Sequence, residues 1–460
     1  MMSSLPMAGA GAFADTVAPT PALPRCAGEG VFAPSPACGG GLGWGRRALA
    51  TAALLLAATT ALAYPLDAYD STGIRRLEST RLAQTGAIND GKQPPGALLN
   101  TTQVDLRLRG QTFYLPAPDP AFTREVASVL TGDMDAYGLA VLDLSDPKRP
   151  RYAEHRADHK QNVGSVGKLV VALAFFQALA DAYPNDIEAR RKLLRSTVVT
   201  ADEFSQTDSH TVRIYDPATR TLTRRAVRIG DKATLYEWLD WMLSPSSNSA
   251  AGMMMREAML LKRFGKNYPR PEAEIKAFFA QTPKSELTAL YEQTFVAPIT
   301  ANGLNIEQLR QGSFFTAGGK QRVPGAGDSY GTARELMRYV LRLEQGRIVD
   351  DFSSLEIKRL LYVTERRIRY ASSPALADAA VYFKSGSLFE CAKEPGFVCK
   401  PYAGNVKNYM NSATIVEAPA GTTKLFYMST LVTNILRKNS AVEHQTLATQ
   451  LHRKLEAAPR

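Results

Sequence analysis

Side chains that commonly hold metal ions are scarce in this 460-residue sequence, which has four cysteines and five histidines. Only Cys391 and Cys399 lie outside the first 45 residues, and neither has a histidine or further cysteine nearby. His155 and His159 have no carboxylate at metal-ligand spacing, so we interpret both as surface residues. We therefore expect no metal and no other cofactor.

Dense basic runs, basic stripes interleaved with aromatics and zinc-finger spacings are also absent. These absences argue against a nucleic-acid partner. The net charge is nevertheless +11, from 55 Lys and Arg against 44 Asp and Glu. Such a surplus suits an anionic membrane surface, a cell-wall polymer or a substrate carboxylate. The 45% hydrophobic and 22% charged residues are typical of a globular protein.

No apolar run reaches the roughly 20 residues of a membrane helix. The longest candidate, residues 48–63, follows Arg46 and Arg47 and ends in the small-x-small triplet Ala-Leu-Ala. This pattern predicts a signal peptide over 46–63 with cleavage after Ala63, and therefore a periplasmic or secreted protein. An uncleaved anchor is the alternative, and only then do we expect membrane contact. Residues 1–45, rich in Gly, Pro, Ala and Ser, are interpreted as disordered or as lying upstream of the true start.

Export bears on the two remaining cysteines. Cys391 and Cys399 are eight residues apart, and in an oxidising compartment such a pair most plausibly closes a small loop as a disulfide. We expect the protein to be a monomer.

The rest of the chain alternates between strand-like and helix-like patterns. Residues 64–109, the lead-in segment, are polar and irregular apart from a short helix near 74–82. Apolar periodicity predicts helices over 165–183, 233–244, 248–265, 271–282, 285–295, 332–346 and 441–457. Strand patterns cover 137–146, 151–155, 380–387, 411–418 and 423–433. Strands at both ends with helices between them predict an α+β fold, in which an antiparallel sheet flanked by helices lies beside an all-helical lobe. A single domain over 110–458 accounts for this order.

The stretch "GSVGK" admits two interpretations. A phosphate-binding P-loop would require a glycine at Asn162 and a hydroxyl residue in place of Leu169, so both positions fail. The alternative is a serine nucleophile, Ser165, with Lys168 one helical turn later. Free backbone NH groups at the helix start would favour an oxyanion there and lower the pKa of Lys168.

Two further stretches extend this pair. "SPSSNS" places Ser246 and Asn248 in a turn before an apolar helix, which taken alone is an N-cap cluster. "FKSGS" places Lys384, Ser385 and Gly386 in a strand, and the glycine suggests a close approach between the strand backbone and a ligand.

The order S-x-x-K, S-x-N, K-[ST]-G, separated by 81 and 138 residues, resembles the penicillin-recognising serine hydrolases, which include class A β-lactamases and D,D-peptidases. The resemblance covers about residues 110–458. It implies the β-lactamase/transpeptidase-like fold, in agreement with the pattern of predicted elements. It also implies an enzyme that acts on a β-lactam or a peptidoglycan peptide.

The resemblance implies a role for each motif residue. Ser165 would be the acylated nucleophile and Lys168 its general base, whereas Ser246 would relay a proton to the leaving nitrogen. Lys384 would take part in the same relay and attract the substrate carboxylate, and Asn248 would contact the substrate amide. Ser385, beside Gly386, would bind the carboxylate through its hydroxyl. The backbone NH groups of Ser165 and Ser387 would form the oxyanion hole.

Two departures from class A β-lactamases stand out. The second motif is Ser246-Ser247-Asn248 where S-D-N is commoner, and no clear E-x-x-L-N element supplies a deacylating glutamate. The nearest candidate, Glu307, is better explained as an exposed glutamate in the first turn of a helix. We therefore expect a β-lactamase-like acyl-hydrolase, with D-alanyl-D-alanine carboxypeptidase and a non-catalytic penicillin- or cell-wall-binding protein as alternatives.

Overall fold

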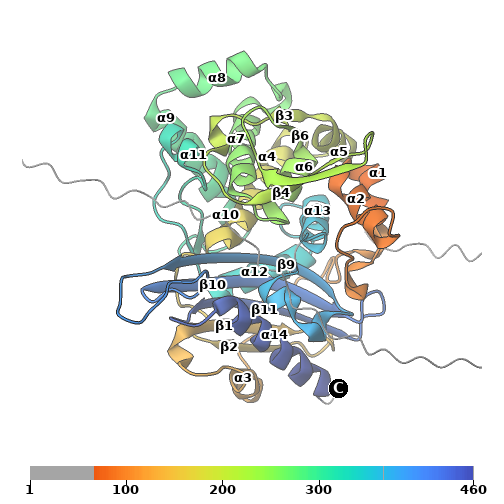
Figure 1. The fold of residues 1–460 in the computed structure, drawn as a ribbon, viewed down its shortest axis with the longest axis vertical. Helices are drawn as coiled ribbons and strands as arrows, with labels where there is room; N and C mark the ends of the chain where they lie inside the picture. Colours follow the sequence, from red (N-terminus) through yellow and green to blue (C-terminus); the bar gives the residue numbers. More distant parts are fainter. Residues whose placement is uncertain (1–66, 366, 459–460) are drawn as a thin grey trace, which may run out of the picture. The chain divides into compact units, whose positions relative to one another are not determined.

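The computed structural model describes residues 67–365 and 367–458 (Figure 1). The leader and signal peptide expected within residues 1–63 lie outside the described residues.

A five-stranded antiparallel sheet is assembled from both ends of the described chain. The strand order is β2-β1-β11-β10-β9, so strands that are distant in sequence lie side by side (Figure 1). The strands are β1 Tyr137–Asp143, β2 Arg151–His155, β9 Ala380–Glu390, β10 Lys407–Ala418 and β11 Leu425–Asn434. All five overlap the predicted strands, and β9 and β10 extend beyond the predicted ranges. The expected α+β fold is confirmed.

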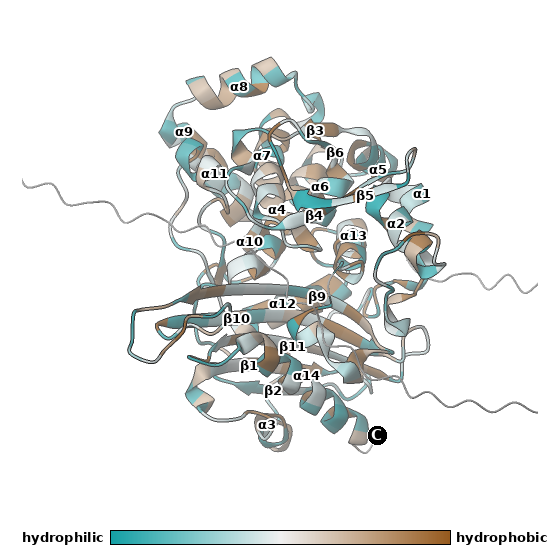
Figure 2. Cartoon of the chain, viewed as in Figure 1, coloured by the Kyte–Doolittle hydropathy of each residue, from teal (hydrophilic) through white to brown (hydrophobic). Residues whose placement is uncertain are grey.

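Both faces of the sheet are buried, and alternate residues of β1 feed two separate cores. Leu139 and Val141 pack in the core that includes α14 (Ser440–Ala457), whereas Ala140 and Leu142 pack in the core that includes α12 (Ala333–Glu344). Side chains alternate across a strand, so one apolar run can serve both faces. Hydrophobic colouring recurs along the central strands in Figure 2. The sheet is therefore a middle layer with helices on both sides.

The helical lobe is built around α4 (Lys168–Ala182), whose side chains are almost all buried. The stretch Gly164–Ala182 is long and apolar enough to cross a membrane, but it is mostly buried inside the protein and is a core helix. The other predicted helices appear as α6 Leu235–Leu243, α7 Asn248–Phe264, α8 Glu272–Gln281 and α9 Lys284–Tyr291.

Some local predictions need correction. The predicted helix at 285–295 continues beyond α9 as a π-helical turn, Glu292–Val296, and then as α10, Ala297–Ala301. Several elements were not predicted, namely α1 Ala68–Thr72, α3 Pro120–Ala127, α5 Ile187–Ser196, α11 Ala317–Arg322, α13 Asp351–Tyr362, the short pairs β3 Val198–Thr200 with β6 Lys232–Thr234 and β7 Leu309–Arg310 with β8 Tyr330–Gly331, and the hairpin β4 Thr211–Asp216 with β5 Thr221–Ala226.

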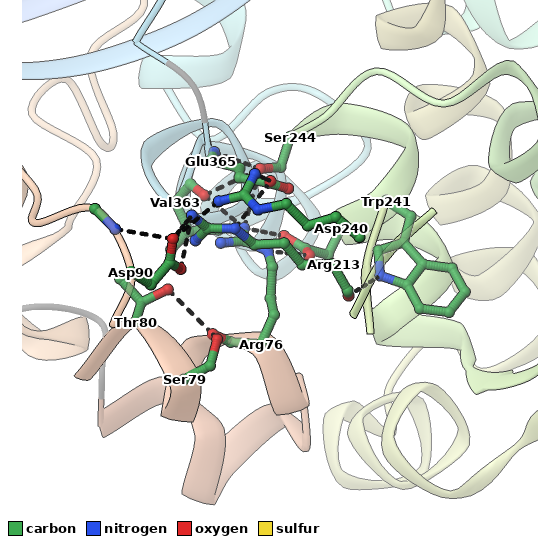
Figure 3. Close-up of polar contacts among 12 residues, drawn as sticks. Arg76, Ser79, Thr80, Asp90, Arg213, Asp240, Trp241, Ser244, Val363 and Glu365 are labelled. Carbon is green, nitrogen blue, oxygen red and sulfur yellow. Dashed lines mark hydrogen bonds and ion pairs between the residues drawn. The ribbon is translucent and has the colours of Figure 1, made fainter. Parts of the chain in front are cut away.

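The lead-in segment packs on the helical lobe through its predicted helix, α2 (Arg75–Gln84). The Arg76 guanidinium is 2.5 Å from Asp240 Oδ1, and it also donates to Ser244 Oγ at 3.0 Å and to the carbonyl oxygen of Val363 at 2.6 Å (Figure 3). The side chains of Arg76 and Asp240 are fully buried. The lead-in segment is thus tied to the turn that follows α6.

A larger set of ion pairs surrounds this contact, and we call it the buried charge cluster. Arg213 on β4 lies 2.9 Å from an Asp90 oxygen and 3.0 Å from a Glu365 oxygen (Figure 3). Arg224 on β5 contacts the same two acids. With Arg76 and Asp240, the cluster contains three arginines and three carboxylates, so its formal charges balance. It joins four segments that are far apart in the sequence.

Candidate active site

Ser165 lies on a 3₁₀ turn, Gly164–Gly167, and Lys168 is the first residue of α4. The sequence predicted one helix from Ser165, but the tighter turn comes first. In a 3₁₀ turn, residues three apart lie almost directly above one another. The Lys168 Nζ atom is accordingly 2.8 Å from Ser165 Oγ.

Lys168 is fully buried and has neutral oxygens as its hydrogen-bond partners. Besides Ser165, Nζ donates to the carbonyl oxygen of Ser246 at 2.7 Å and to Asn248 Oδ1 at 2.7 Å. Burial lowers the pKa of Lys168 to about 7, although the charge of Asp208 acts in the opposite direction. Burial therefore accounts for the low pKa, whereas the sequence analysis attributed it to the helix start. Near neutral pH, a large share of Lys168 is an unprotonated amine.

The second motif forms the turn between α6 and α7. Ser246 has a φ of 68°, and Asn248 is the first residue of α7. The Ser246 hydroxyl accepts a hydrogen bond from Lys384 Nζ at 2.7 Å and lies 3.3 Å from Lys168 Nζ. One serine hydroxyl therefore bridges the two lysines of the first and third motifs.

The third motif lies on β9, which is one of the two edge strands of the sheet. Burial, followed by the charges of Lys168 and Arg369, holds the pKa of Lys384 well below its usual range. A Cβ atom on Gly386 would lie 2.1 Å from the Val163 carbonyl oxygen and 2.7 Å from Ser165 N. At Gly386 the strand backbone therefore closely approaches the backbone around the nucleophile.

The three motifs open onto a cleft of about 310 Å³. Seven of the eight predicted site residues line it, namely Ser165, Ser246, Asn248, Lys384, Ser385, Gly386 and Ser387. Lys384, Arg369 and Lys320 also bring positive charge to the lining, and in the described part of the chain no Asp or Glu lines it. Such a cleft suits an anionic ligand.

The sequence comparison that decides the family concerns most of this domain. A family model described as the β-lactamase enzyme family matches residues 121–415, which is more than half of the chain. The chain belongs to this family. The resemblance drawn from the three motifs is thus confirmed at the level of the family.

The chain also matches solved structures that are distant in sequence. PBP-A, in a mutant form determined as an acyl-enzyme complex with penicillin G, has 14% identity and a TM-score of 0.46, with 75% of this chain and 100% of that chain covered. A β-lactamase from Sphaerobacter thermophilus has 12% identity and a TM-score of 0.43, with coverages of 72% and 94%. The TLA-3 extended-spectrum β-lactamase has 10% identity and a TM-score of 0.44, with coverages of 73% and 96%. No curated protein matches the sequence.

Arg369 is a cleft residue that the sequence analysis missed. Its guanidinium donates to Ser385 Oγ at 2.9 Å and to Ser387 Oγ at 3.1 Å, and it lies 4.9 Å from the centre of the Tyr402 ring. Burial lowers its pKa, yet an arginine keeps its charge in proteins. No local pattern indicates such a role, because the arginine reaches the motif only through the folded backbone.

Asp208 is the second residue that was missed. It lies before β4, and its side chain is 1% exposed. Although burial acts to raise its pKa, the hydrogen bonds from His210 and from the backbone NH of Ser249 lower the pKa of Asp208 to about 2. The sequence offered one signal for such a residue. Ser247 stands in the middle of the second motif where Asp is commoner, so the turn lacks a carboxylate of its own.

The remaining predictions concern residues outside the cleft. Glu307 is exposed, as predicted, but it lies in a turn before β7 rather than in the first turn of a helix. It does not line the cleft. His155 lies at the end of β2 with Nε2 2.9 Å from the Met134 carbonyl oxygen. Across residues 67–365 and 367–458, no group of three or more His, Cys, Asp or Glu side chains could hold a metal ion. Cys391 and Cys399 form the predicted disulfide in the connection between β9 and β10.

Proposed function

We propose that the protein is an exported serine acyl-hydrolase that opens β-lactam amide bonds through an acyl-enzyme on Ser165. The observation that carries this proposal is the 2.8 Å contact between Ser165 Oγ and a buried Lys168 whose pKa is about 7. A neutral amine at this distance can accept the hydroxyl proton as the oxygen attacks a carbonyl carbon.

The remaining steps follow from the positions of the other side chains. When Ser165 Oγ bonds to the carbonyl carbon and the C–N bond breaks, the leaving nitrogen needs a proton. Ser246 can give its hydroxyl proton and regain one from Lys384, which lies 2.7 Å away. Backbone NH groups of Ser165 and Ser387 would hold the oxyanion.

Substrate binding is assigned by charge and hydrogen bonding. Arg369 and Ser385 present a guanidinium and a hydroxyl to a substrate carboxylate. The Asn248 oxygen already accepts from Lys168, so its NH₂ group is left to donate to the carbonyl of the substrate's side-chain amide. Both features suit a penicillin, which carries a carboxylate and an amide.

A D-alanyl-D-alanine carboxypeptidase is a second candidate. It is favoured by the lack of any Asp or Glu among the described residues that line the cleft, because the acyl-enzyme then has no carboxylate to activate the deacylating water. The same residues would acylate, but a β-lactam adduct would persist. A non-catalytic binding protein is disfavoured, because Ser165 and Lys168 are within hydrogen-bond distance.

Labelling with a fluorescent penicillin tests the proposal, with Ser165→Ala as the control. We expect a covalent adduct on the unmodified protein and none on the variant. Fast turnover of a chromogenic β-lactam would support the β-lactamase, whereas a lasting adduct would support the carboxypeptidase. If neither β-lactams nor acyl esters modify Ser165, both functions are contradicted.

Export is part of the proposal and has its own measurement. If the chain is secreted as its N-terminal pattern predicts, mass spectrometry of the mature protein should find Tyr64 at its N-terminus. An intact leader on the exported protein would favour the anchored form instead.

A further inference from the structure

The second motif lacks the acidic residue that commonly stands at its centre. Ser247 takes that place, and its side chain caps α7, since Oγ accepts a hydrogen bond from Ala250 N at 3.1 Å. A serine can cap a helix but brings no charge to the helix start, where a carboxylate is favourable. The turn therefore depends on another segment for negative charge.

Asp208 brings a carboxylate to this position from a separate loop. Its Oδ2 atom accepts from Ser247 Oγ at 2.9 Å, from Asn248 N at 2.7 Å and from Ser249 N at 3.0 Å. Two donors of the motif and one from the residue that follows it thus converge on one oxygen. Backbone NH groups at a helix start have no partner within the helix, so this oxygen satisfies two of them.

The Asp208 loop is itself held in place on both sides. Its other oxygen, Oδ1, lies 2.6 Å from His210 Nδ1 and 3.1 Å from His210 N. Nearby, Ser249 Oγ donates to the Ser205 carbonyl oxygen at 2.6 Å. The loop is therefore docked against the start of α7 at two points, and the carboxylate has little freedom to move away.

We propose that Asp208 is a positioning residue that supplies, from outside the motif, the carboxylate that the Ser246-Ser247-Asn248 turn lacks. It fixes the backbone of Asn248, whose side chain contacts Lys168, and thereby holds the left-handed backbone at Ser246. Non-glycine residues in that conformation persist only where their surroundings hold them. The inference rests on the proposed acylation of Ser165.

This arrangement predicts that the turn accepts a single carboxylate at either of two positions. Ser247→Asp alone would place a second carboxylate within hydrogen-bond distance of the first, and like charges so close repel. Asp208→Ala alone would leave the turn with none. The double substitution Asp208→Ala, Ser247→Asp would restore one.

A double-mutant cycle tests this reciprocity, with the rate of Ser165 labelling by a fluorescent penicillin as the first readout. We expect each single substitution to slow labelling at least tenfold and the double substitution to return it to within about threefold of the unmodified protein. Recovery by moving the carboxylate is not expected of a residue that merely packs the loop. Additive losses in the double variant, or an unchanged rate in Asp208→Ala, would overturn the proposal.

Asp186→Ala is the matched control, because Asp186 caps α5 through Ala189 N at 2.8 Å and does not line the cleft. We expect it to lower the melting temperature and to leave labelling unchanged. If Asp208→Ala does not fold, Asp208→Asn takes its place, since it removes the charge and keeps the size.

Melting temperatures over the same cycle separate this inference from the proposed function. If the unmodified protein takes no label, the proposed function fails. The inference is then supported if the double variant melts above both single variants, and overturned if the two losses add.

Discussion

The cleft and the buried charge cluster both concentrate charged side chains, but they do so in opposite ways. Lys168 and Lys384 are buried among neutral hydroxyl, amide and carbonyl oxygens. In the cluster, each arginine meets at least one carboxylate, as Arg76 meets Asp240. The cleft leaves its two lysines without a carboxylate partner, whereas the cluster pairs each arginine with one.

The difference indicates separate tasks. Burying ammonium groups that have no carboxylate partner destabilises the folded state, and the pKa of such a group falls, as that of Lys168 does. That property is useful only if a neutral amine or an anionic substrate is required. Paired charges instead join segments, because losing one partner leaves the other buried and unpaired. Substitutions in the two regions should therefore have opposite consequences for activity and stability.

The largest expected effect is on acylation, in Lys168→Met. Loss of the general base should slow labelling of Ser165 by about 10²- to 10⁴-fold. The free energy of unfolding should stay the same or rise, because burial destabilises the charged form of the Lys168 amine, and Met is an apolar side chain of similar length. Stopped-time labelling and urea denaturation measure the two quantities.

The pH dependence provides the control for this variant. The neutral form of Lys168 is the base, so the labelling rate of the unmodified protein should rise as the pH increases through about 7. This rise should be absent in Lys168→Met. If Lys168→Met is less stable than the unmodified protein and its labelling rate still rises with pH, then the assignment of Lys168 to catalysis rather than to stability is contradicted.

The next effect is on stability, in Arg76→Ala. Asp240 would be left as a buried, unpaired carboxylate, which should lower the free energy of unfolding by about 3–5 kcal/mol. Labelling per folded molecule should change less than tenfold, because Ser244, the cleft residue that Arg76 contacts, is not one of the motif residues. Urea denaturation is the measurement.

An apolar replacement of the pair sharpens the same test. Arg76→Met combined with Asp240→Leu should recover most of the lost stability, since neither charge then remains buried alone. A loss below about 1 kcal/mol in Arg76→Ala, which is the range of an exposed ion pair, would contradict the role assigned to the cluster.

The smallest effect is expected for Arg369→Gln. Removing a charged donor should reduce the labelling efficiency of a carboxylate-bearing β-lactam by about 10- to 100-fold, which corresponds to one charge-assisted hydrogen bond. A neutral ester substrate should be acylated at an unchanged rate. Arg437→Gln, at an exposed arginine paired with Glu394, is the control that should change neither rate. Equal losses for both substrates in Arg369→Gln would indicate a general disruption of the cleft.

Much of the fold could be predicted because its signals are local. The strand at residues 137–146 and the helix at 165–183 follow from apolar patterning, and the three motifs carry their own helix, turn and strand contexts. The N-terminal cap of α12 shows where prediction from local signals stops. Thr332 Oγ1 accepts a hydrogen bond from Glu335 N, but the Glu335 side chain accepts one from Asn305 N, thirty residues away, rather than from the backbone of Thr332.

The parts that could not be predicted depend on contacts between distant segments. Asp208 lies in a loop and Arg369 in a short 3₁₀ turn, neither segment carries a recognisable motif, and each residue reaches a motif only after the chain has folded. The hairpin of β4 and β5 was missed for a different reason. Its strands carry many arginines, so they lack clean apolar alternation, and two of those arginines belong to the buried charge cluster.

The position of β11 in the sheet has a consequence for how the chain folds. β11 lies between β1 and β10, and Tyr137 pairs with Thr433. The middle of the sheet is therefore completed by a strand that follows the whole helical lobe in the sequence. Pairings between residues so far apart in the chain close slowly, because a long loop must be ordered first. A chain that ends before Leu425 would lose the strand that both cores share, so we expect it to be degraded or to aggregate rather than to persist as a shorter enzyme.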